Sequence, residues 1–260
     1  MKPHRLVVLL LTGLFLWSGK VSASVDGTEL FTQANKLYQE AEVSKDLKEK
    51  ETKFQEAVEL YEQLKQSGFT SGPLYYNMGN AYSRLGKRGK AIVNYLRAQQ
   101  LMPRNEDLRT NLKYAQEHLQ VTEKGPPIFL KSLLFFHYST TLNEETRIFL
   151  VLYLMCASFI ILFIFLRFKV LKWFYITAGI FILGLIISLG IRIYENETIQ
   201  RGVAITKCQL RTGPSKDMSA IWEVPEGSEV TIEEDREGWY KIQIGKDKKG
   251  WVPKSEVEAL

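Results

Sequence analysis

The chain has 260 residues, which is enough for one or two compact domains. Its 45% apolar and 24% charged content argues against wholesale disorder. The net charge of +5, from 34 basic and 29 acidic residues, is mild, and the absence of a basic stripe argues against a nucleic-acid partner.

The first 23 residues have the pattern of a secretory signal peptide. Lys2 and Arg5 give a basic start, and the apolar segment 6–17 that follows is too short for a comfortable membrane span. Small residues at 21–23 predict cleavage after Ala23. An uncleaved N-terminal anchor is the alternative.

Two longer apolar runs within 148–193 predict a pair of transmembrane helices. The runs 148–166 and 173–191 carry no charged residue, and each covers a bilayer core of about 30 Å. The connector 167–172 carries three basic residues and no acidic one, so we expect a cytoplasmic loop. Both flanks then face the periplasm. Because the runs hold no ionisable group, a transporter or channel is not indicated.

Residues 24–123 predict an all-α helical repeat domain. The segment 72–104 matches the tetratricopeptide (TPR) pattern of about 34 residues. The matching positions are Tyr75, Met78, Gly79, Tyr82, Ala91, Tyr95, Ala98 and Pro103. A weaker copy precedes it, lengthened by roughly ten residues in the charged run 44–53, and a helix at about 105–120 caps the array.

Repeats of this kind bind partners on the face lined by their first helices. Five residues project from the helix 74–85 and the turn after it, away from the packing face: Tyr76, Asn80, Ser83, Arg84 and Lys87. An amide and a cation one turn apart predict a site for an extended peptide or a C-terminal carboxylate. A solvated helix face is the alternative. The basic cluster at 84–90 either meets an acidic partner or forms a soluble turn.

Residues 124–147 predict an amphipathic bridge. The Gly-Pro-Pro sequence at 125–127 ends the preceding helix, and the aromatic-rich segment 128–138 is typical of a helix lying in the membrane surface. Packing against the helical repeats is the alternative. Thr140 and Thr141, followed by Glu144, predict a capped start for the first span.

Residues 198–260 predict a small all-β barrel with an SH3-like fold. Apolar residues alternate with polar ones in the short segments 202–206, 229–232, 239–244 and 250–253. Four blocks, at 210–215, 224–230, 238–242 and 250–253, follow the order found in bacterial SH3 domains, which this region resembles. Trp239, Trp251 and Pro253 are candidate partner-binding residues. The alternative is that Trp239, Trp251 and Trp222 mainly fill a small core, an interpretation favoured for Trp222 and Trp251.

The sequence gives no sign of an active site. It contains no nucleophile–base arrangement, no metal-ligand spacing and no phosphate loop, so we expect no enzyme activity, no cofactor and no metal. Cys156 lies in an apolar run and Cys208 in the distant C-terminal region, so no disulfide is predicted.

The order of modules is a signal peptide, tetratricopeptide repeats, an amphipathic bridge, two spans and an SH3-type barrel. This order resembles BatE-type proteins of the bacterial aerotolerance (Bat) group. The resemblance implies an inner-membrane protein that works beside von Willebrand A-domain Bat proteins and a MoxR-type ATPase in stress tolerance. The residues themselves predict a membrane-anchored scaffold with two periplasmic interaction modules. The alternative is a cell-wall sensor whose SH3-type domain binds peptidoglycan.

Overall fold

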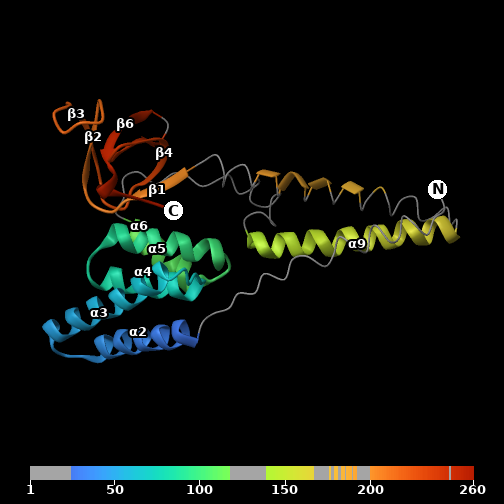
Figure 1. The fold of residues 1–260 in the computed structure, drawn as a ribbon, viewed down its shortest axis with the longest axis horizontal. Helices are drawn as coiled ribbons and strands as arrows, with labels where there is room; N and C mark the ends of the chain where they lie inside the picture. The colour runs from blue at the N-terminus through green and yellow to red at the C-terminus, as the bar shows by residue number, and fades with distance from the viewer. Residues whose placement is uncertain are drawn as a thin grey trace.

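The computed structural model describes residues 25–117, 139–166, 200–245 and 247–260, with scattered residues between 176 and 191. These residues form a helical domain, one long separate helix and a β domain (Figure 1). The predicted signal peptide 1–23, the segment 124–138 of the predicted bridge and the predicted loop 167–172 lie outside the described residues.

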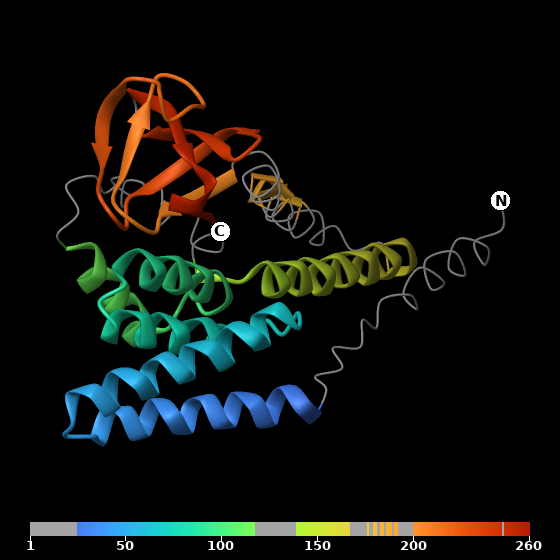
Figure 2. The same ribbon diagram turned by 60° about the vertical axis from the view of Figure 1, so that its left-hand side comes forward.

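The helical domain consists of two helix pairs and a fifth helix, stacked in chain order (Figure 2). The pairs are α2 (Val25–Val43) with α3 (Leu47–Gln66) and α4 (Gly72–Arg84) with α5 (Arg88–Leu101), and α6 (Glu106–Gln116) follows. Buried residues from all five helices form one hydrophobic core, including Ala34, Tyr61, Leu64, Met78, Tyr82, Ala91, Tyr95, Ala98 and Leu108. The predicted all-α region is therefore confirmed.

The second helix pair is packed as its sequence pattern predicts. A Cβ atom at Gly79 would lie 2.5 Å from the ring of Tyr95, so only glycine permits this approach of α4 to α5. Tyr82 and Tyr95 are each 2% exposed and fill the space between the helices. Helix α5 ends at Leu101, two residues before Pro103.

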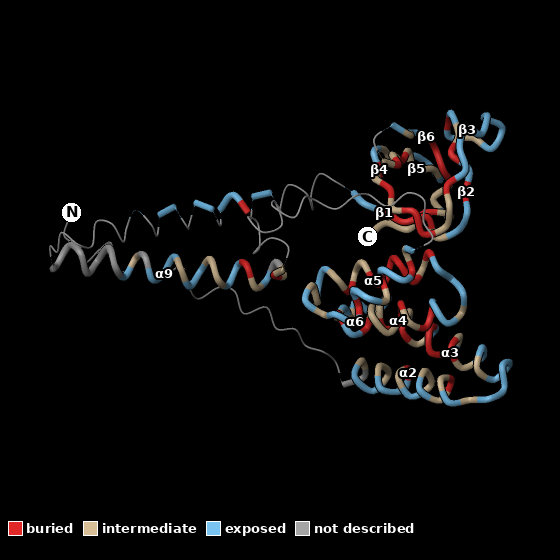
Figure 3. The backbone as a smooth tube through the Cα atoms, turned by 180° about the vertical axis from the view of Figure 1, so that it is seen from behind, coloured by how far each residue is buried: buried red, intermediate tan, exposed pale blue. Residues whose placement is uncertain are grey.

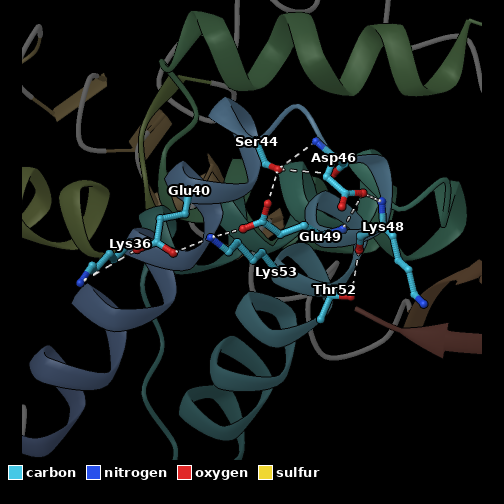
Figure 4. A network of polar contacts seen from close by, with 8 residues as sticks. All are labelled: Lys36, Glu40, Ser44, Asp46, Lys48, Glu49, Thr52 and Lys53. Atoms are coloured by element: carbon cyan, nitrogen blue, oxygen red, sulfur yellow. Dashed lines mark hydrogen bonds and ion pairs between the residues drawn. The ribbon is translucent and has the colours of Figure 1, made fainter.

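The charged run 44–53 forms the turn between α2 and α3 and the start of α3, which we call the charged tip; its polar contacts are shown in Figure 4. Asp46 caps α3 by accepting hydrogen bonds from backbone N–H groups of its first turn. Lys53 joins the two helices because its ammonium group lies 3.0 Å from both Glu40 and Glu49. The extra residues lengthen the helices, as expected: α2 and α3 have 19 and 20 residues, whereas α4 and α5 have 13 and 14.

The first predicted span forms the helix α9 (Leu142–Leu166), which projects away from both domains (Figure 1). Its start is a capping box: Thr141 Oγ1 accepts a hydrogen bond from the Glu144 backbone N–H, and Glu144 Oε2 accepts one from the Thr141 N–H. Arg104 adds an ion pair to Glu144 at 2.5 Å. The Thr141 N–H and then Arg104 hold the pKa of Glu144 below its usual range. The predicted capped start is confirmed.

The described residues of the second run lie alongside α9 (Figures 1 and 2), and Ser188 donates a hydrogen bond of 2.6 Å to the buried Glu145 near the start of α9. Among the residues that the structure describes, no helix combines the length and the apolar character needed to traverse a bilayer. Side chains at 159–166 and much of 173–191 lie outside the description. The two transmembrane helices therefore stay a prediction.

The β domain is an antiparallel sheet of seven described strands in the order β3-β2-β6-β5-β4-β1-β7. The strands are β1 (Gln200–Ala204), β2 (Cys208–Arg211), β3 (Ala220–Val224), β4 (Glu229–Arg236), β5 (Trp239–Ile244), β6 (Lys248–Pro253) and β7 (Val257–Ala259), with the 3-10 turn η1 (Lys254–Glu256) before the last strand. The four predicted strands overlap β1, β4, β5 and β6, whereas β2, β3 and β7 were not predicted.

The β domain encloses a second hydrophobic core, separate from that of the helices (Figure 3). Alternate residues of the central strands supply it, including Leu210, Val230, Ile232, Ile242, Ile244 and Val252. Cys208 also belongs to this core, and burial raises the pKa of its thiol to about 12. Buried residues alternate along part of β4 and β5, as the period-two pattern leads us to expect, whereas β1 and β6 each bury three consecutive residues.

Candidate interaction surfaces

Asn35 on α2 receives hydrogen bonds from two neighbouring helices. Its Oδ1 accepts from the Tyr61 hydroxyl of α3 at 2.7 Å and from Nδ2 of Asn77 on α4 at 2.8 Å. Burial raises the pKa of Tyr61, so its hydroxyl stays protonated and able to donate. This single amide therefore links its own helix pair to the next pair.

Asn80 on α4 repeats this arrangement one unit later. Its Oδ1 accepts from the Tyr95 hydroxyl of α5 at 2.8 Å and from Nδ2 of Asn111 on α6 at 2.9 Å. Tyr95 follows Tyr61 by 34 residues, and Asn111 follows Asn77 by 34 residues. Both donors thus recur with one period, which is what stacked structural repeats produce.

The two acceptors, Asn35 and Asn80, are farther apart in the sequence than the 34 residues that separate equivalent donors, because the first unit is longer. Tyr61 lies 26 residues after Asn35, but Tyr95 lies only 15 residues after Asn80. The difference is taken up by the charged tip at 44–53, which is inserted between Asn35 and Tyr61. The first helix pair therefore repeats the hydrogen-bond arrangement of the second with a longer hairpin.

Three of the five predicted groove residues make hydrogen bonds of 3.2 Å or less to internal partners. Besides Asn80, Tyr76 accepts a hydrogen bond of 3.2 Å from Asn111. Arg84 forms a two-point ion pair with Glu42 of α2, with Nε 2.8 Å from Oε1 and Nη2 3.1 Å from Oε2.

The other two predicted groove residues are Ser83 and Lys87, and both are exposed. Lys87 makes a long hydrogen bond of 3.4 Å to Gln55. The predicted amide and cation, Asn80 and Arg84, therefore both have internal partners. A ligand here would meet Tyr76 and Ser83 directly and would compete with Glu42 for Arg84.

Glu258 of β7 is the centre of a contact between the β domain and the helical domain. Its Oε1 lies 2.6 Å from Nη1 of Arg97 on α5 and 3.5 Å from Nζ of Lys65 on α3. Arg97 also donates to the backbone oxygen of Ala259 at 2.6 Å. Burial acts to raise the pKa of Glu258, but the hydrogen bond and charge of Arg97, helped by Lys65, more than offset it and hold the pKa below its usual range.

A second acidic residue of the β domain caps α5. The first-turn N–H of Gly89 donates to Oε1 of Glu226 at 2.7 Å, while the N-cap residue Lys87 makes no side-chain capping bond. A Cβ atom at Gly89 would lie 2.5 Å from the backbone oxygen of Ala204. The basic side chains of the cluster at 84–90 do not make this contact, because the donor is the backbone N–H of Gly89, and Arg84 pairs instead with Glu42 of α2.

Apolar contacts complete this docking. Val203 of β1 is 0% exposed and belongs to the core of the helical domain, and Ile205 and Leu260 pack against the same core. Gln116 of α6 donates to Glu229 of β4 at 2.8 Å. The two domains therefore share buried surface beyond their ion pairs.

The predicted SH3-face residues lie on neighbouring strands. Trp239 of β5 stands opposite Pro253 of β6, and Trp251 is two residues before Pro253 on the same face of that strand. Trp239 and Pro253 are half-buried, whereas Trp251 is only 8% exposed and the Arg236 guanidinium lies 5.0 Å from its ring centroid. Trp251 therefore mainly packs, as the alternative held.

The prediction that Trp222 fills the core is wrong. Trp222 is 45% exposed, and the ammonium of Lys248 lies 3.1 Å from its ring centroid. The reason is position: β3 ends the strand order and pairs only with β2 among the described strands, so one side of it has no neighbour.

Residues 207–258 match the family model of the bacterial SH3 domain. This range covers β2 to β7 almost entirely, so the predicted SH3-like domain is confirmed. No curated protein and no solved structure matches the chain. The tetratricopeptide assignment and the Bat resemblance stay predictions.

Proposed function

We propose that this chain is a membrane-anchored scaffold with no catalytic role. It holds a tetratricopeptide-type helical domain and a bacterial SH3 domain together on the periplasmic side of a bacterial inner membrane. The partners are other membrane proteins, and the resemblance to BatE-type proteins suggests von Willebrand A-domain Bat proteins in a stress or aerotolerance complex.

The docking of Glu258 on Arg97 is the observation that carries this proposal. Residues 25–117 precede both apolar runs and residues 200–260 follow them, yet the two regions share a half-buried ion pair and a hydrophobic core. Domains in contact must lie on the same side of a membrane. Two crossings between them satisfy this requirement, and the basic connector 167–172 favours a cytoplasmic turn.

Exposed apolar side chains support membrane anchoring. On α9, Leu150, Val151, Tyr153, Leu154 and Met155 are all between 39% and 55% exposed, and the second run exposes Ile180, Leu183, Ile186 and Ile187. Apolar surface of this extent normally has a cover, and lipid is the cover that two long apolar runs favour. The hydrogen bond from Ser188 to Glu145 brings the end of the second run to the start of the first, as an antiparallel hairpin requires.

The recurrence of the asparagine–tyrosine unit supports the tetratricopeptide assignment. Its donors repeat at 34 residues, the length of that repeat, and Gly79 and Tyr95 make the close helix contact that the pattern needs. Such repeats present a surface for binding and no reaction chemistry.

The groove is tested by blocking it with one bulky side chain. Ser83 is exposed on α4, so Ser83→Trp should occlude the surface, and Glu56→Trp on the exposed side of α3 is the matched control. We expect von Willebrand A-domain membrane proteins to co-purify with the wild-type chain and the control but not with Ser83→Trp. Equal recovery with both variants would contradict the groove.

A cell-wall sensor is the second candidate, because Trp239 and Pro253 stay partly exposed on strands that do not carry the docking contacts. The purified full chain should then sediment with isolated cell-wall sacculi. Sedimentation abolished by Trp239→Ala would favour the sensor. Recovery entirely in the supernatant would exclude it.

A further inference from the structure

All the large apolar side chains that the described β domain exposes gather at one end of its sheet. They are Met218, Ile221 and Trp222, with 46%, 50% and 45% of their surface exposed. Ile221 and Trp222 are consecutive residues of β3, at the point where its register against β2 shifts, and Met218 lies in the loop that precedes it. We call this set the β3 patch. It lies at the opposite end of the strand order from β1 and β7, which dock on the helices.

The β3 patch is held in place by specific contacts. The guanidinium of Arg211 donates to the backbone oxygens of Lys216 at 2.9 Å and Met218 at 2.8 Å, which fixes the loop over β2. Gly213 lies in the same loop, and a Cβ atom at this position would lie 3.2 Å from Met218. The patch is thus preorganised, so binding there costs little ordering of the protein.

The strand beneath the patch has one edge open. β3 pairs with β2 on one side and with no other described strand. Unpaired N–H and C=O groups along such an edge favour the addition of another strand, and the exposed side chains beside them give specificity.

The charges around the β3 patch indicate which strand would fit. Four lysines of the β domain pair with acids: Lys207 with Glu223 of β3, Lys241 with Glu234, Lys249 with Glu233 and Lys254 with Asp235. Two lysines near the patch, Lys216 and Lys248, have no ion pair within the described part of the chain. The ammonium of Lys248 lies over the Trp222 ring. The nearby acids are Asp217, which bonds Ser215, the paired Glu223, and Glu256, which feels the charges of Arg211 and Lys216.

We propose that β3 binds an extended acidic segment of a partner protein, which adds a strand to the sheet and places apolar side chains on the β3 patch. The inference names the partner class of the β domain and so rests on its proposed interaction role. A second copy of the chain fits less well, because it would set Lys216 and Lys248 against the same cations of its partner.

The test uses the full chain in detergent and two nine-residue peptides, one alternating valine with glutamate and one alternating valine with lysine. We expect the glutamate peptide to bind about tenfold more tightly than the lysine peptide at low salt and to lose that advantage at high salt. It should slow amide exchange at 220–224. Ile221→Glu should weaken its binding by about tenfold or more, whereas Leu47→Glu, at an 82% exposed site on α3, should not.

Unchanged exchange within β5 shows that Ile221→Glu leaves the domain folded. Equal binding of both peptides, or no binding, would overturn the proposal while leaving the groove experiment with Ser83→Trp to decide the scaffold role. Slower amide exchange at Trp239 and Trp251, instead of at 220–224, would overturn the β3 site but support the interaction role of the β domain. Dimerisation that Ile221→Glu abolishes would identify a second copy as the occupant and overturn the acidic segment.

Discussion

Arg97 and Glu258 are 161 residues apart in the chain, yet Nη1 of the arginine lies 2.6 Å from Oε1 of the glutamate. Their side chains are only 16% and 26% exposed. An ion pair shielded to this degree is worth more than one at the surface, because water and salt screen it less. It joins the two regions that flank the apolar runs, and the proposed placement of both domains on one side of the membrane depends on it.

Replacing Glu258 by glutamine should loosen the docking of the β domain. The change leaves Arg97 and Lys65 without their shared anion, and we expect a loss of about 2 kcal/mol in the free energy of docking. Hydrogen exchange of β7 in the full chain measures it. Glu237→Gln, at an exposed site of the same domain, is the control. Equal effects of the two substitutions would contradict a special role for Glu258.

The contribution of Glu258 should depend on pH in one direction. Its folded pKa is lower than the reference value of 4.5, so the folded state binds this proton less readily than the unfolded state. The stabilisation is therefore complete at neutral pH and is lost as the pH falls below 4.5 through the folded pKa. The stability difference between wild type and Glu258→Gln, measured across this range, should shrink towards zero. A difference that stays constant down to pH 2 would refute the assignment.

Gly89→Ala should separate helix stability from docking. Alanine favours a helix by about 0.5–1 kcal/mol over glycine, so α5 itself should gain stability. The added Cβ would lie 2.5 Å from the Ala204 oxygen, so the β domain must shift away and lose the Glu226 cap. We expect faster amide exchange in β1 with no loss of protection between α4 and α5. Unaltered exchange in β1 would show that the contact is not maintained in solution.

The repeated asparagine unit should give similar coupling energies in both copies. A double-mutant cycle between Asn80→Ala and Tyr95→Phe should show about 1 kcal/mol of coupling, because each substitution removes one end of a partly buried hydrogen bond. The cycle between Asn35→Ala and Tyr61→Phe should give a similar value. Asn80→Ala combined with Tyr61→Phe, which share no bond, serves as the control and should be additive. Coupling in only one copy would contradict the equivalence of the two units.

The helices were predictable because their packing needs specific residue types at fixed spacing. The sequence pattern assigns a packing role to Gly79, Tyr82 and Ala91, and each residue has that role in the structure. The short strands β3 and β7 were not predictable, because β3 exposes four of its five residues and β7 has three residues. Neither shows the alternation on which a strand prediction depends.

The interaction surfaces were less predictable, because they depend on contacts between distant parts of the chain. Nothing near Arg84 in the sequence indicates that Glu42 pairs with it, and nothing near Gly89 points to Glu226. The 34-residue spacing of Asn77 and Asn111 is visible in the sequence, but their shared role follows only from the hydrogen bonds.

The most direct test is the sidedness of both domains in one membrane. In a chain carrying Cys156→Ser and Cys208→Ala, single cysteines are introduced as Leu47→Cys, Met218→Cys or Lys169→Cys, and intact spheroplasts are treated with a membrane-impermeant maleimide. Leu47 and Met218 are exposed sites of the two domains, and Lys169 lies in the basic connector. We predict labelling at 47 and 218 without lysis and at 169 only after the membrane is opened. Labelling at 47 or 218 alone would contradict the account, because docked domains cannot lie on opposite sides of a membrane.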